Sequence, residues 1–208
     1  MGGVFRDAEA ICSFALKGNR MTVTTKMRKE IGVERVLVDK PKLAARVAAL
    51  ASSIDDWYPD STPILVGVLN GASVFMTELM QEMSIPVTVD FMAVSSYGSS
   101  TESSGVVQIL KDLSTSIEGK DVLVVEDIVD SGLTLQYLLD VLARRNPRTI
   151  RVVALLRKMK PGTIDVPVDL VGFEIPDEFV IGYGLDYAGR YRNLPYIGVL
   201  SPEAIMAN

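Results

Sequence analysis

The chain has 208 residues, of which 48% are apolar and 23% charged, with 26 acidic against 21 basic side chains for a net charge of -5. This composition describes one folded domain rather than a disordered chain, and the sequence pI of about 4.9 argues against a nucleic-acid-binding face. With no histidine and a single cysteine, Cys12, the chain excludes histidine catalysis, histidine-ligated zinc and an intramolecular disulfide.

The sequence carries no recognisable targeting or membrane signal. No run of about 18 apolar residues is present, and the N-terminus lacks the charged-then-apolar order of a secretory signal. The lone cysteine fits a reducing compartment, so we expect a cytoplasmic protein with no membrane partner. Residues 1–30 show little periodicity and are interpreted as an N-terminal extension, followed by a single domain over residues 31–208.

The first predicted elements follow in the order helix, strand, helix, strand. Pro41 suits the first turn of a helix that ends near residues 57–59. Its apolar residues recur on one face at helical spacing: Leu43, Val47, Leu50, Ala51 and Ile54. The apolar run 64–69 is typical of a strand buried on both faces. A second helix, ending at Pro86, is predicted from an apolar stripe of Val74, Phe75, Leu79 and Met83. Residues 87–94 predict another strand, which completes the crossover unit of an α/β sheet.

The middle of the chain continues the same alternation. Strands are predicted at about residues 106–110 and at 122–125, the second being the most apolar of them. A helix over about residues 133–143 turns a row of leucines toward the sheet: Leu135, Leu138, Leu139 and Leu142. Further strands are predicted at residues 152–156 and 170–173. The remainder is rich in Gly, Tyr and Pro, which favours an irregular layer over the sheet rather than another helix pair.

Residues 95–105 form a low-complexity segment that contains six serines. So polar a stretch cannot build a core, and it is predicted to be a mobile loop. Two interpretations stay open, a loop without a task and a lid over a binding site. Tyr97 favours the lid, because a tyrosine in this setting needs a surface to cover.

The segment that carries chemistry lies between the most apolar strand and the helix after it. It reads Glu126-Asp127-Ile128-Val129-Asp130-Ser131-Gly132-Leu133-Thr134. Ligands of open α/β sheets bind beyond the carboxyl ends of the strands, so the three acids are expected at a site. The small residues after them would present backbone N–H groups at a helix N-terminus, which suits a phosphate monoester. Acids beside a phosphate also call for a cation or ligand hydroxyls between them, and Mg²⁺ is the natural choice.

The same residues allow a plainer interpretation. Asp, Ser and Gly after a strand are ordinary turn residues that cap a helix. Three acids within five residues favour function, since no basic partner is visible near them in the sequence. Carboxylates so close together destabilise a fold unless something cationic binds.

Residues 126–134 resemble the phosphoribosyl-pyrophosphate signature of the type I phosphoribosyltransferases, and two acids followed by Ile are typical of the hypoxanthine-guanine branch. Three further segments resemble the same family: the lid at 95–98, the purine-reading lysine segment at 155–158 and the C-terminal hood at 171–187. The resemblance spans about residues 33–200 in order. It implies the type I phosphoribosyltransferase fold, an α/β structure with a mainly parallel sheet flanked by helices. A small hood, formed mainly by about residues 170–208, is expected above the sheet.

The resemblance also implies an activity. Enzymes of this branch transfer the ribose 5-phosphate of phosphoribosyl pyrophosphate to N9 of hypoxanthine or guanine and release pyrophosphate, which is purine salvage. Mg²⁺ is the implied cofactor, and a homodimer or homotetramer is the implied assembly. The expected partners are these small substrates and neither nucleic acid nor membrane.

The resemblance assigns roles on the phosphoribosyl side of the site. Glu126 and Asp127 would hold the ribose hydroxyls and a magnesium. The 5′-phosphate would be wrapped by Ser131, Gly132, Leu133 and Thr134. Arg192 would meet the pyrophosphate with its guanidinium, although Arg190 and Arg192 could also be plain surface charges. Asp186 would bind a second magnesium.

The resemblance also assigns the purine side and the catalytic groups. Asp130 would be the acid/base at the purine N7, and Ser96 and Tyr97 would close over the site. Lys158 would donate to the oxygen at C6, which prefers an oxopurine over adenine. Phe179 would stack on the ring, and Val180 would use its main chain on the Watson-Crick edge. Contacts near Val180 and Asp186 would decide whether xanthine is accepted. Outside the resemblance, Lys158 suits a solvated lysine and Phe179 a core residue.

The segment Leu69-Asn70-Gly71 matches the loop where this family reaches pyrophosphate through a non-proline cis peptide. The sequence departs from the family at Asn70, where Lys or Arg is more usual. Asn70-Gly71 is also an ordinary turn pair, so both interpretations stay open.

Other functions and motifs fit the sequence less well. A nucleic-acid-binding regulator on the same fold would be expected to show a basic face or a lost acid, and this sequence has neither. A xanthine-preferring or adenine-preferring relative remains open for xanthine, while Lys158 and Phe179 disfavour adenine. Gly182-Tyr183-Gly184 lacks the third glycine of a dinucleotide fingerprint, and Gly119-Lys120-Asp121 precedes a strand, so neither predicts a nucleotide loop.

Overall fold

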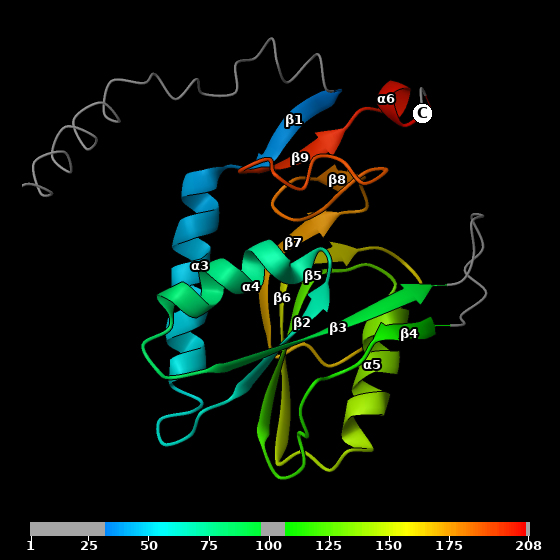
Figure 1. Ribbon diagram of the computed structural model, residues 1–208. Helices are drawn as coiled ribbons and strands as arrows, with labels where there is room; N and C mark the ends of the chain where they lie inside the picture. The colour runs from blue at the N-terminus through cyan, green and yellow to red at the C-terminus, as the bar shows by residue number, and fades with distance from the viewer. Residues whose placement is uncertain (1–31, 97–106, 207–208) are drawn as a thin grey trace, which may run out of the picture.

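The computed structural model describes residues 32–96 and 107–206, and a six-stranded sheet forms its centre (Figure 1). The strands are β2 (Ile64–Leu69), β3 (Thr88–Ser96), β4 (Val107–Lys111), β5 (Asp121–Val129), β6 (Thr149–Met159) and β7 (Leu170–Pro176), in the order β4-β3-β2-β5-β6-β7. All neighbours pair in parallel except β4, which runs antiparallel to β3. The mainly parallel α/β sheet expected from the sequence is confirmed.

Helices cover both faces of this sheet. Helices α3 (Lys40–Asp55) and α4 (Ala72–Glu82) pack on one face, and α5 (Leu133–Ala143) packs on the other (Figure 1). The central strand β5 serves both layers, because neighbouring side chains of a strand point to opposite faces. Leu123 and Val125 contact the α3 and α4 layer, whereas Val122 and Val124 contact the α5 layer.

Helix α3 matches its prediction closely. The Asp39 side chain accepts the backbone N–H of Lys42 at 3.0 Å, and Pro41 lies in the first turn. The buried face is the one expected from the spacing: Leu43, Val47, Leu50, Ala51 and Ile54.

The apolar stripe of α4 is shifted from its prediction. Its buried residues are Ala72, Phe75, Met76 and Leu79. Val74 and Met83 are only partly buried. The helix begins at Ala72, directly after the turn at Gly71, and its buried residues follow one another at three- and four-residue spacing, which includes Met76 in the buried face.

A smaller sheet lies over the edge where the parallel strands end. It has the order β1-β9-β8, with β1 (Val33–Val38), β9 (Ile197–Leu200) and β8 (Val180–Ile181), and helix α6 (Pro202–Met206) follows (Figure 1). We call these elements, with the connecting loop 182–196, the hood. Because β7 is the edge strand of the larger sheet, residues 170–176 lie outside the hood, and β1 contributes from the N-terminal side.

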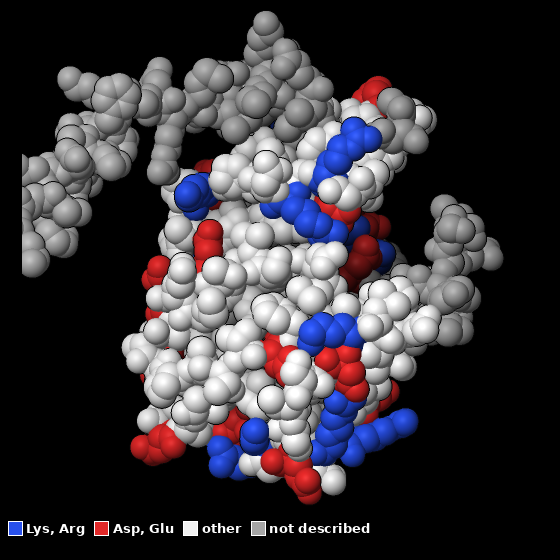
Figure 2. Space-filling model, viewed as in Figure 1, with Lys and Arg blue, Asp and Glu red and all other residues white. Residues whose placement is uncertain are grey.

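None of the helices in residues 32–96 and 107–206 has the length and apolar character that a membrane span requires. On the face that Figure 2 shows, basic side chains gather at the upper right with acidic ones directly below them, and both kinds lie together again toward the lower edge. Acidic side chains therefore accompany the basic ones on this face.

Candidate active site

Charged and small residues converge where the parallel strands end. Asn70 and Gly71 follow β2, Asp127 and Asp130 lie at the end of β5, and Lys158 lies near the end of β6. The register places β2 and β6 on either side of β5, so these ends share one edge of the sheet. This is the edge at which open α/β sheets bind ligands.

Glu126 and Asp127, which we call the acid pair, lie inside β5 rather than beyond it. The predicted strand ends at Val125, but β5 continues to Val129 because Glu126 and Ile128 pair with β6. Glu126 is buried, and its Oε2 atom has no hydrogen-bond partner among the described residues. Burial raises the pKa of Glu126, and the adjacent Asp127 charge raises it further. Such a group is stabilised by a ligand that brings a cation or hydroxyls.

Asp127 lies tightly against the turn after β2. Its Oδ1 accepts the N–H of Ile128 at 2.9 Å, while a Cβ built on Gly71 would lie 1.5 Å from Oδ2. Burial is also the main cause that raises the pKa of Asp127. Only glycine at position 71 leaves room for this carboxylate.

The peptide bond between Leu69 and Asn70 is cis, as the resemblance implied for this loop. The Asn70 carbonyl accepts the hydroxyl of Ser73 at 2.7 Å and the N–H of the same residue at 3.3 Å. The segment is therefore a defined turn into α4 rather than an ordinary type I′ pair of a hairpin.

Residues 130–134, the phosphate loop, lead into α5. Gly132 has φ +83°, and a Cβ there would approach the Ile164 carbonyl oxygen to 2.9 Å, so glycine is required for both conformation and space. As the N-cap of α5 it offers no side chain to the first turn. A cavity of about 140 Å³ opens here, lined by residues 126–132 with Thr134 and Leu135. The start of α5 thus borders a hollow that also contains the acid pair.

The hood reaches the acid pair through a second glycine. Gly184 has φ +102°, and a Cβ there would lie 2.1 Å from the Gly71 carbonyl oxygen. Gly182 has φ +94°, and a Cβ built there would lie 2.1 Å from the Tyr196 carbonyl oxygen. The two glycines of Gly182-Tyr183-Gly184 therefore allow close backbone packing. The comparison with a dinucleotide fingerprint gave no indication of this role.

Two predicted phosphoribosyl residues bind each other in the hood. Arg192 forms an ion pair with Asp186 at 2.6 Å and donates to the Gly184 carbonyl at 2.6 Å. Both charges act on Asp127, whose pKa is raised by burial, lowered by Arg192 and raised by Asp186. The hood therefore holds one cation and one anion beside the acid pair.

Asp130 has basic partners that the sequence did not reveal. Its Oδ2 lies 3.0 Å from Lys158 Nζ, and its Oδ1 forms an ion pair with Lys160. Lys158 also lies 3.1 Å from Asp177 Oδ1. The expectation of acids without basic partners is wrong for Asp130, because the lysines come from the next strand about thirty residues later. The side chain of Lys158 is only 12% exposed, which rules out a freely solvated lysine.

Phe179, directly before the hood strand β8, is an exposed aromatic side chain. It is 40% exposed rather than part of the core, while Val180 beside it is buried. The ring of Tyr187 contacts Phe179 edge to face, with centroids 5.3 Å apart. Tyr187 also donates to the Ile205 carbonyl at 2.6 Å. The sequence analysis did not predict the contact between the two rings. Tyr187, eight residues after Phe179, was the residue that could have indicated it.

The predicted lid lies outside this description. Tyr97 falls in residues 97–106, which the structure does not describe, and Ser96 is described only as the last residue of β3. Their catalytic roles therefore stay predictions.

The donor set fits a hard cation held partly by a ligand. Within residues 32–96 and 107–206, no group of three or more acidic or cysteine side chains is placed to hold a metal. Glu126 nevertheless offers a buried, unpartnered carboxylate oxygen, and the carboxylate of the half-buried Asp127 follows directly in the chain. Mg²⁺ commonly takes one or two carboxylates and completes its shell with water and substrate oxygens, which this arrangement permits.

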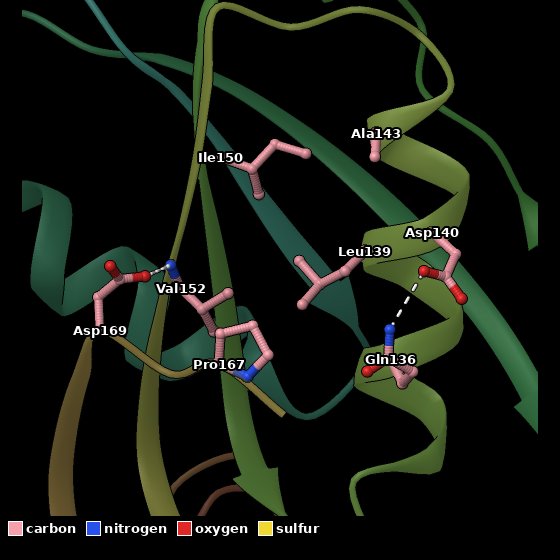
Figure 3. A pocket seen from close by; sticks show the side chains of 8 residues that line it. All are labelled: Gln136, Leu139, Asp140, Ala143, Ile150, Val152, Pro167 and Asp169. Carbon is pink, nitrogen blue, oxygen red and sulfur yellow. Dashed lines mark hydrogen bonds between the residues drawn. The ribbon is translucent and has the colours of Figure 1, made fainter. Parts of the chain in front are cut away.

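A second hollow of about 250 Å³ lies between α5 and β6 (Figure 3). Its polar groups already have partners: Gln136 donates to Asp140 at 3.1 Å, and Asp169 accepts the N–H of Val152 at 2.7 Å. The rest of its lining is apolar. It offers no convergent set of groups for chemistry.

Comparison with known proteins finds one family. The model for the phosphoribosyl transferase domain matches residues 35–188. The chain is 51% identical over 170 residues to the hypoxanthine-guanine phosphoribosyltransferase of Bacillus subtilis (strain 168), a match that covers 82% of this chain and 94% of the relative.

Solved structures agree with the sequence comparison. A hypoxanthine phosphoribosyltransferase from Staphylococcus aureus superposes with a TM-score of 0.81 at 40% identity, covering 86% of this chain and 98% of that one. The hypoxanthine phosphoribosyltransferase from Trypanosoma cruzi, in complex with the product IMP, gives 0.77 at 39% identity and covers 83% and 96%.

Proposed function

The chain belongs to the phosphoribosyltransferase family, and from this premise we propose how its residues carry out the reaction of the hypoxanthine-guanine branch. The protein is a purine-salvage transferase of that branch. It transfers the ribose 5-phosphate of phosphoribosyl pyrophosphate to N9 of hypoxanthine or guanine, giving IMP or GMP and pyrophosphate. The observation that carries the residue assignment is the acid pair, with a buried and unpartnered Glu126 oxygen, beside the start of a helix.

The phosphate loop binds the 5′-phosphate in this proposal. Ser131, Gly132, Leu133 and Thr134 contribute backbone N–H groups and two hydroxyls at the start of α5, where the helix dipole favours an anion. Leu69, Asn70 and Gly71 approach the pyrophosphate through the main chain. Arg192 contributes a guanidinium to the same group, and it must then exchange its contact with Asp186 for the ligand.

The acid pair acts on the ribose. Glu126 and Asp127 accept hydrogen bonds from the ribose hydroxyls, and their negative charge stabilises a ribose that gains cationic character as the bond to pyrophosphate breaks. Their burial keeps these interactions strong, since water screens them little.

Mg²⁺ is the proposed cofactor, and Glu126, Asp127 and Asp186 are its proposed protein contacts. When bound, the ion neutralises charge that develops on the leaving pyrophosphate. A cation would also offset the repulsion among these carboxylates. Burial is the main cause that raises the pKa of Glu126 and of Asp127, and a neighbouring acid adds to it in each case, Asp127 for Glu126 and Asp186 for Asp127.

The purine lies between the end of β6 and the hood. Lys158 donates to the oxygen at C6, Phe179 stacks on the ring and Val180 uses its main chain on the base edge. Asp130 is the acid/base at N7, as its place beside Lys158 supports. Ser96 and Tyr97 close over the reacting atoms and exclude water.

The wider assignments are proposals of the same kind. Residues 31–208 form one phosphoribosyltransferase domain after an extension of residues 1–30. The protein acts in the cytoplasm as a homodimer or homotetramer, and its partners are small molecules rather than nucleic acid or membrane. The mixed charges on the face in Figure 2 support the last point over a nucleic-acid-binding regulator.

The test is nucleotide formation from phosphoribosyl pyrophosphate and Mg²⁺ with hypoxanthine, guanine, xanthine and adenine in parallel, beside a metal-free control. We expect turnover of hypoxanthine or guanine that disappears without metal. Preference for xanthine would move the protein to another branch. If the folded protein binds phosphoribosyl pyrophosphate but turns over no base, the proposed transferase activity is contradicted and a sensor is favoured.

A further inference from the structure

Asp130 is held by two lysines, and each carboxylate oxygen faces its own. Lys158 Nζ lies 3.0 Å from Oδ2, and Lys160 forms an ion pair with Oδ1. The Asp130 side chain is 45% exposed, so it stands at the mouth of the site rather than inside the core. The carboxylate therefore keeps one cationic partner when the other is drawn away.

Lys158 has competing tasks. It already divides its ammonium group between Asp130 and Asp177, at 3.0 and 3.1 Å. In the proposed function it also donates to the purine oxygen at C6. An ammonium has three N–H donors, and each contact made with the purine weakens its hold on Asp130.

Lys160 has no such competing task, and the backbone that carries it is tied to the phosphate loop. The hydroxyl of Thr163 donates to the Lys160 carbonyl at 3.0 Å, and the N–H of Ile164 donates to the Ser131 carbonyl at 2.9 Å. Gly162, with φ +81°, makes the turn between them. These hydrogen bonds attach residues 160–164 to the loop that contains Asp130.

We propose that Lys160 is a positioning residue for the transfer reaction, which holds the Asp130 carboxylate oriented and ionised when Lys158 turns to the purine. This inference rests on the proposed function, since it assumes that Lys158 reads the base. It gives the two lysines different roles: Lys158 contacts substrate, whereas Lys160 acts only through Asp130. Three charged groups lie around that carboxylate among the described residues: Lys158, Lys160 and, behind them, Asp177.

The charges around Asp130 support this division. Burial raises the pKa of Asp130, but Lys160 first and Lys158 second outweigh it, so that the pKa lies below its ordinary value. Lys160 in turn has a raised pKa, chiefly because of Asp130. The pair stays charged at neutral pH even if Lys158 is withdrawn.

The first experiment compares Lys160→Met, Lys160→Arg and Lys120→Met. The methionine keeps the length and removes the charge, arginine restores the charge, and Lys120 is an exposed lysine in the turn before β5. We expect Lys160→Met to lower kcat at least about tenfold, part of the roughly 10² to 10⁴ that a general acid or base contributes. The KM for phosphoribosyl pyrophosphate should stay unchanged, Lys160→Arg should recover most of the rate, and Lys120→Met should match the parent.

The second experiment asks whether Lys160 acts through Asp130. In an Asp130→Asn background, Lys160→Met should cause no further loss of kcat, because the group it positions is gone. In the parent, Lys160→Met should move the acidic limb of kcat/KM to higher pH. An additive loss, or an unmoved limb, overturns the inference.

A third readout does not depend on turnover. The pKa of the Asp130 carboxyl, measured by carbon-13 NMR in the ligand-free protein, should be higher in Lys160→Met than in the parent and unchanged in Lys120→Met. If the parent has no turnover, the proposed function fails while this measurement still tests the ion pair. An unchanged Asp130 pKa contradicts the role of Lys160 whatever the activity, and Lys160→Gln gives the same test should the methionine variant not fold.

Discussion

The ring of Tyr187 meets the ring of Phe179 edge to face, with planes at 82° and centroids 5.3 Å apart. The Tyr187 hydroxyl donates to the carbonyl of Ile205 in α6. An exposed aromatic that is to stack on a purine loses less freedom on binding if a neighbouring ring already orients it. The C-terminal helix thus supports, through one tyrosine, the proposed base-stacking surface.

Replacement of Tyr187 should therefore affect the purine. Tyr187→Leu removes the ring and should raise the KM for hypoxanthine roughly twofold to tenfold, the range expected for one aromatic pair, with kcat at saturating base unchanged. Steady-state kinetics with varied hypoxanthine measures this. Tyr187→Phe is the control, since it keeps the ring and loses only the bond to Ile205. A similar rise of KM in both variants would assign the effect to α6 instead.

Gly71→Ala should abolish most activity without unfolding the protein. The backbone at Gly71 has φ -63° and ψ -44°, which alanine adopts freely, so the cost comes from the clash of the new Cβ with Asp127. Displacement of that carboxylate should weaken phosphoribosyl pyrophosphate binding at least about tenfold, as misplaced reacting groups commonly do. Calorimetric titration with phosphoribosyl pyrophosphate and Mg²⁺ measures the loss.

Gly119→Ala is the matched control for that variant. Gly119 has φ +67° and open space around its Cβ position. Alanine there should cost about 1 kcal/mol of stability through backbone strain and leave binding intact. If Gly119→Ala weakens binding as much as Gly71→Ala, the clash with Asp127 is not the cause.

Lys158→Met should weaken recognition of the purine without weakening the binding of phosphoribosyl pyrophosphate. The variant removes one of the two ion pairs of Asp130 but none of the groups of residues 131–134. The Kd for phosphoribosyl pyrophosphate should therefore stay within about twofold, while kcat/KM for hypoxanthine falls roughly 10²-fold because a hydrogen bond to a polar substrate group is lost. Binding titration and initial rates test the two halves. Equal losses for both substrates would show that Lys158 supports the site as a whole.

Asp121 provides a test of acid stability away from the site. Hydrogen bonds from Arg148, with help from Ser61 and Thr149, hold the pKa of this carboxyl well below its ordinary value despite burial. A depressed folded-state pKa means that the stabilisation is present above the unfolded pKa of about 3.9 and is lost as pH falls toward the folded value.

Asp121→Asn should accordingly lower the free energy of unfolding at pH 7 by about 1 kcal/mol, and the difference from the parent should shrink below about pH 4. Urea denaturation at several pH values measures it. Asp112→Asn, which breaks the exposed ion pair with Arg145, should change stability by less than about 0.5 kcal/mol. A constant difference for Asp121→Asn from pH 3 to pH 7 would contradict the linkage.

The sequence predicts those parts of the fold that local chemistry determines. Strand β2 lies between Pro63 and Asn70, and its predicted bounds match the observed ones because strong turn residues end it on both sides. The end of β5 was predicted four residues early, since carboxylates normally disfavour a strand and here continue it. Local propensity determines the bounds of β2, whereas pairing with β6 determines where β5 ends.

The site was predicted less completely than the fold, for the same reason. The segment 126–134 is continuous and shows its acids directly. The partners of Asp130 come from β6 and the turn after it, and the space for Asp127 depends on Gly71 and Gly184. Contacts between segments so distant in sequence follow from the topology of the sheet, which no local pattern records.

The alternation of side chains along β5 restricts how the length of this strand can change. Leu123 and Val125 belong to the α3 and α4 layer and Val122 and Val124 to the α5 layer, so insertion or deletion of one residue among them would move the shifted side chains to the opposite core. A change of two residues would preserve the alternation. The part of β5 that leads into the acid pair can therefore change in length only in even steps.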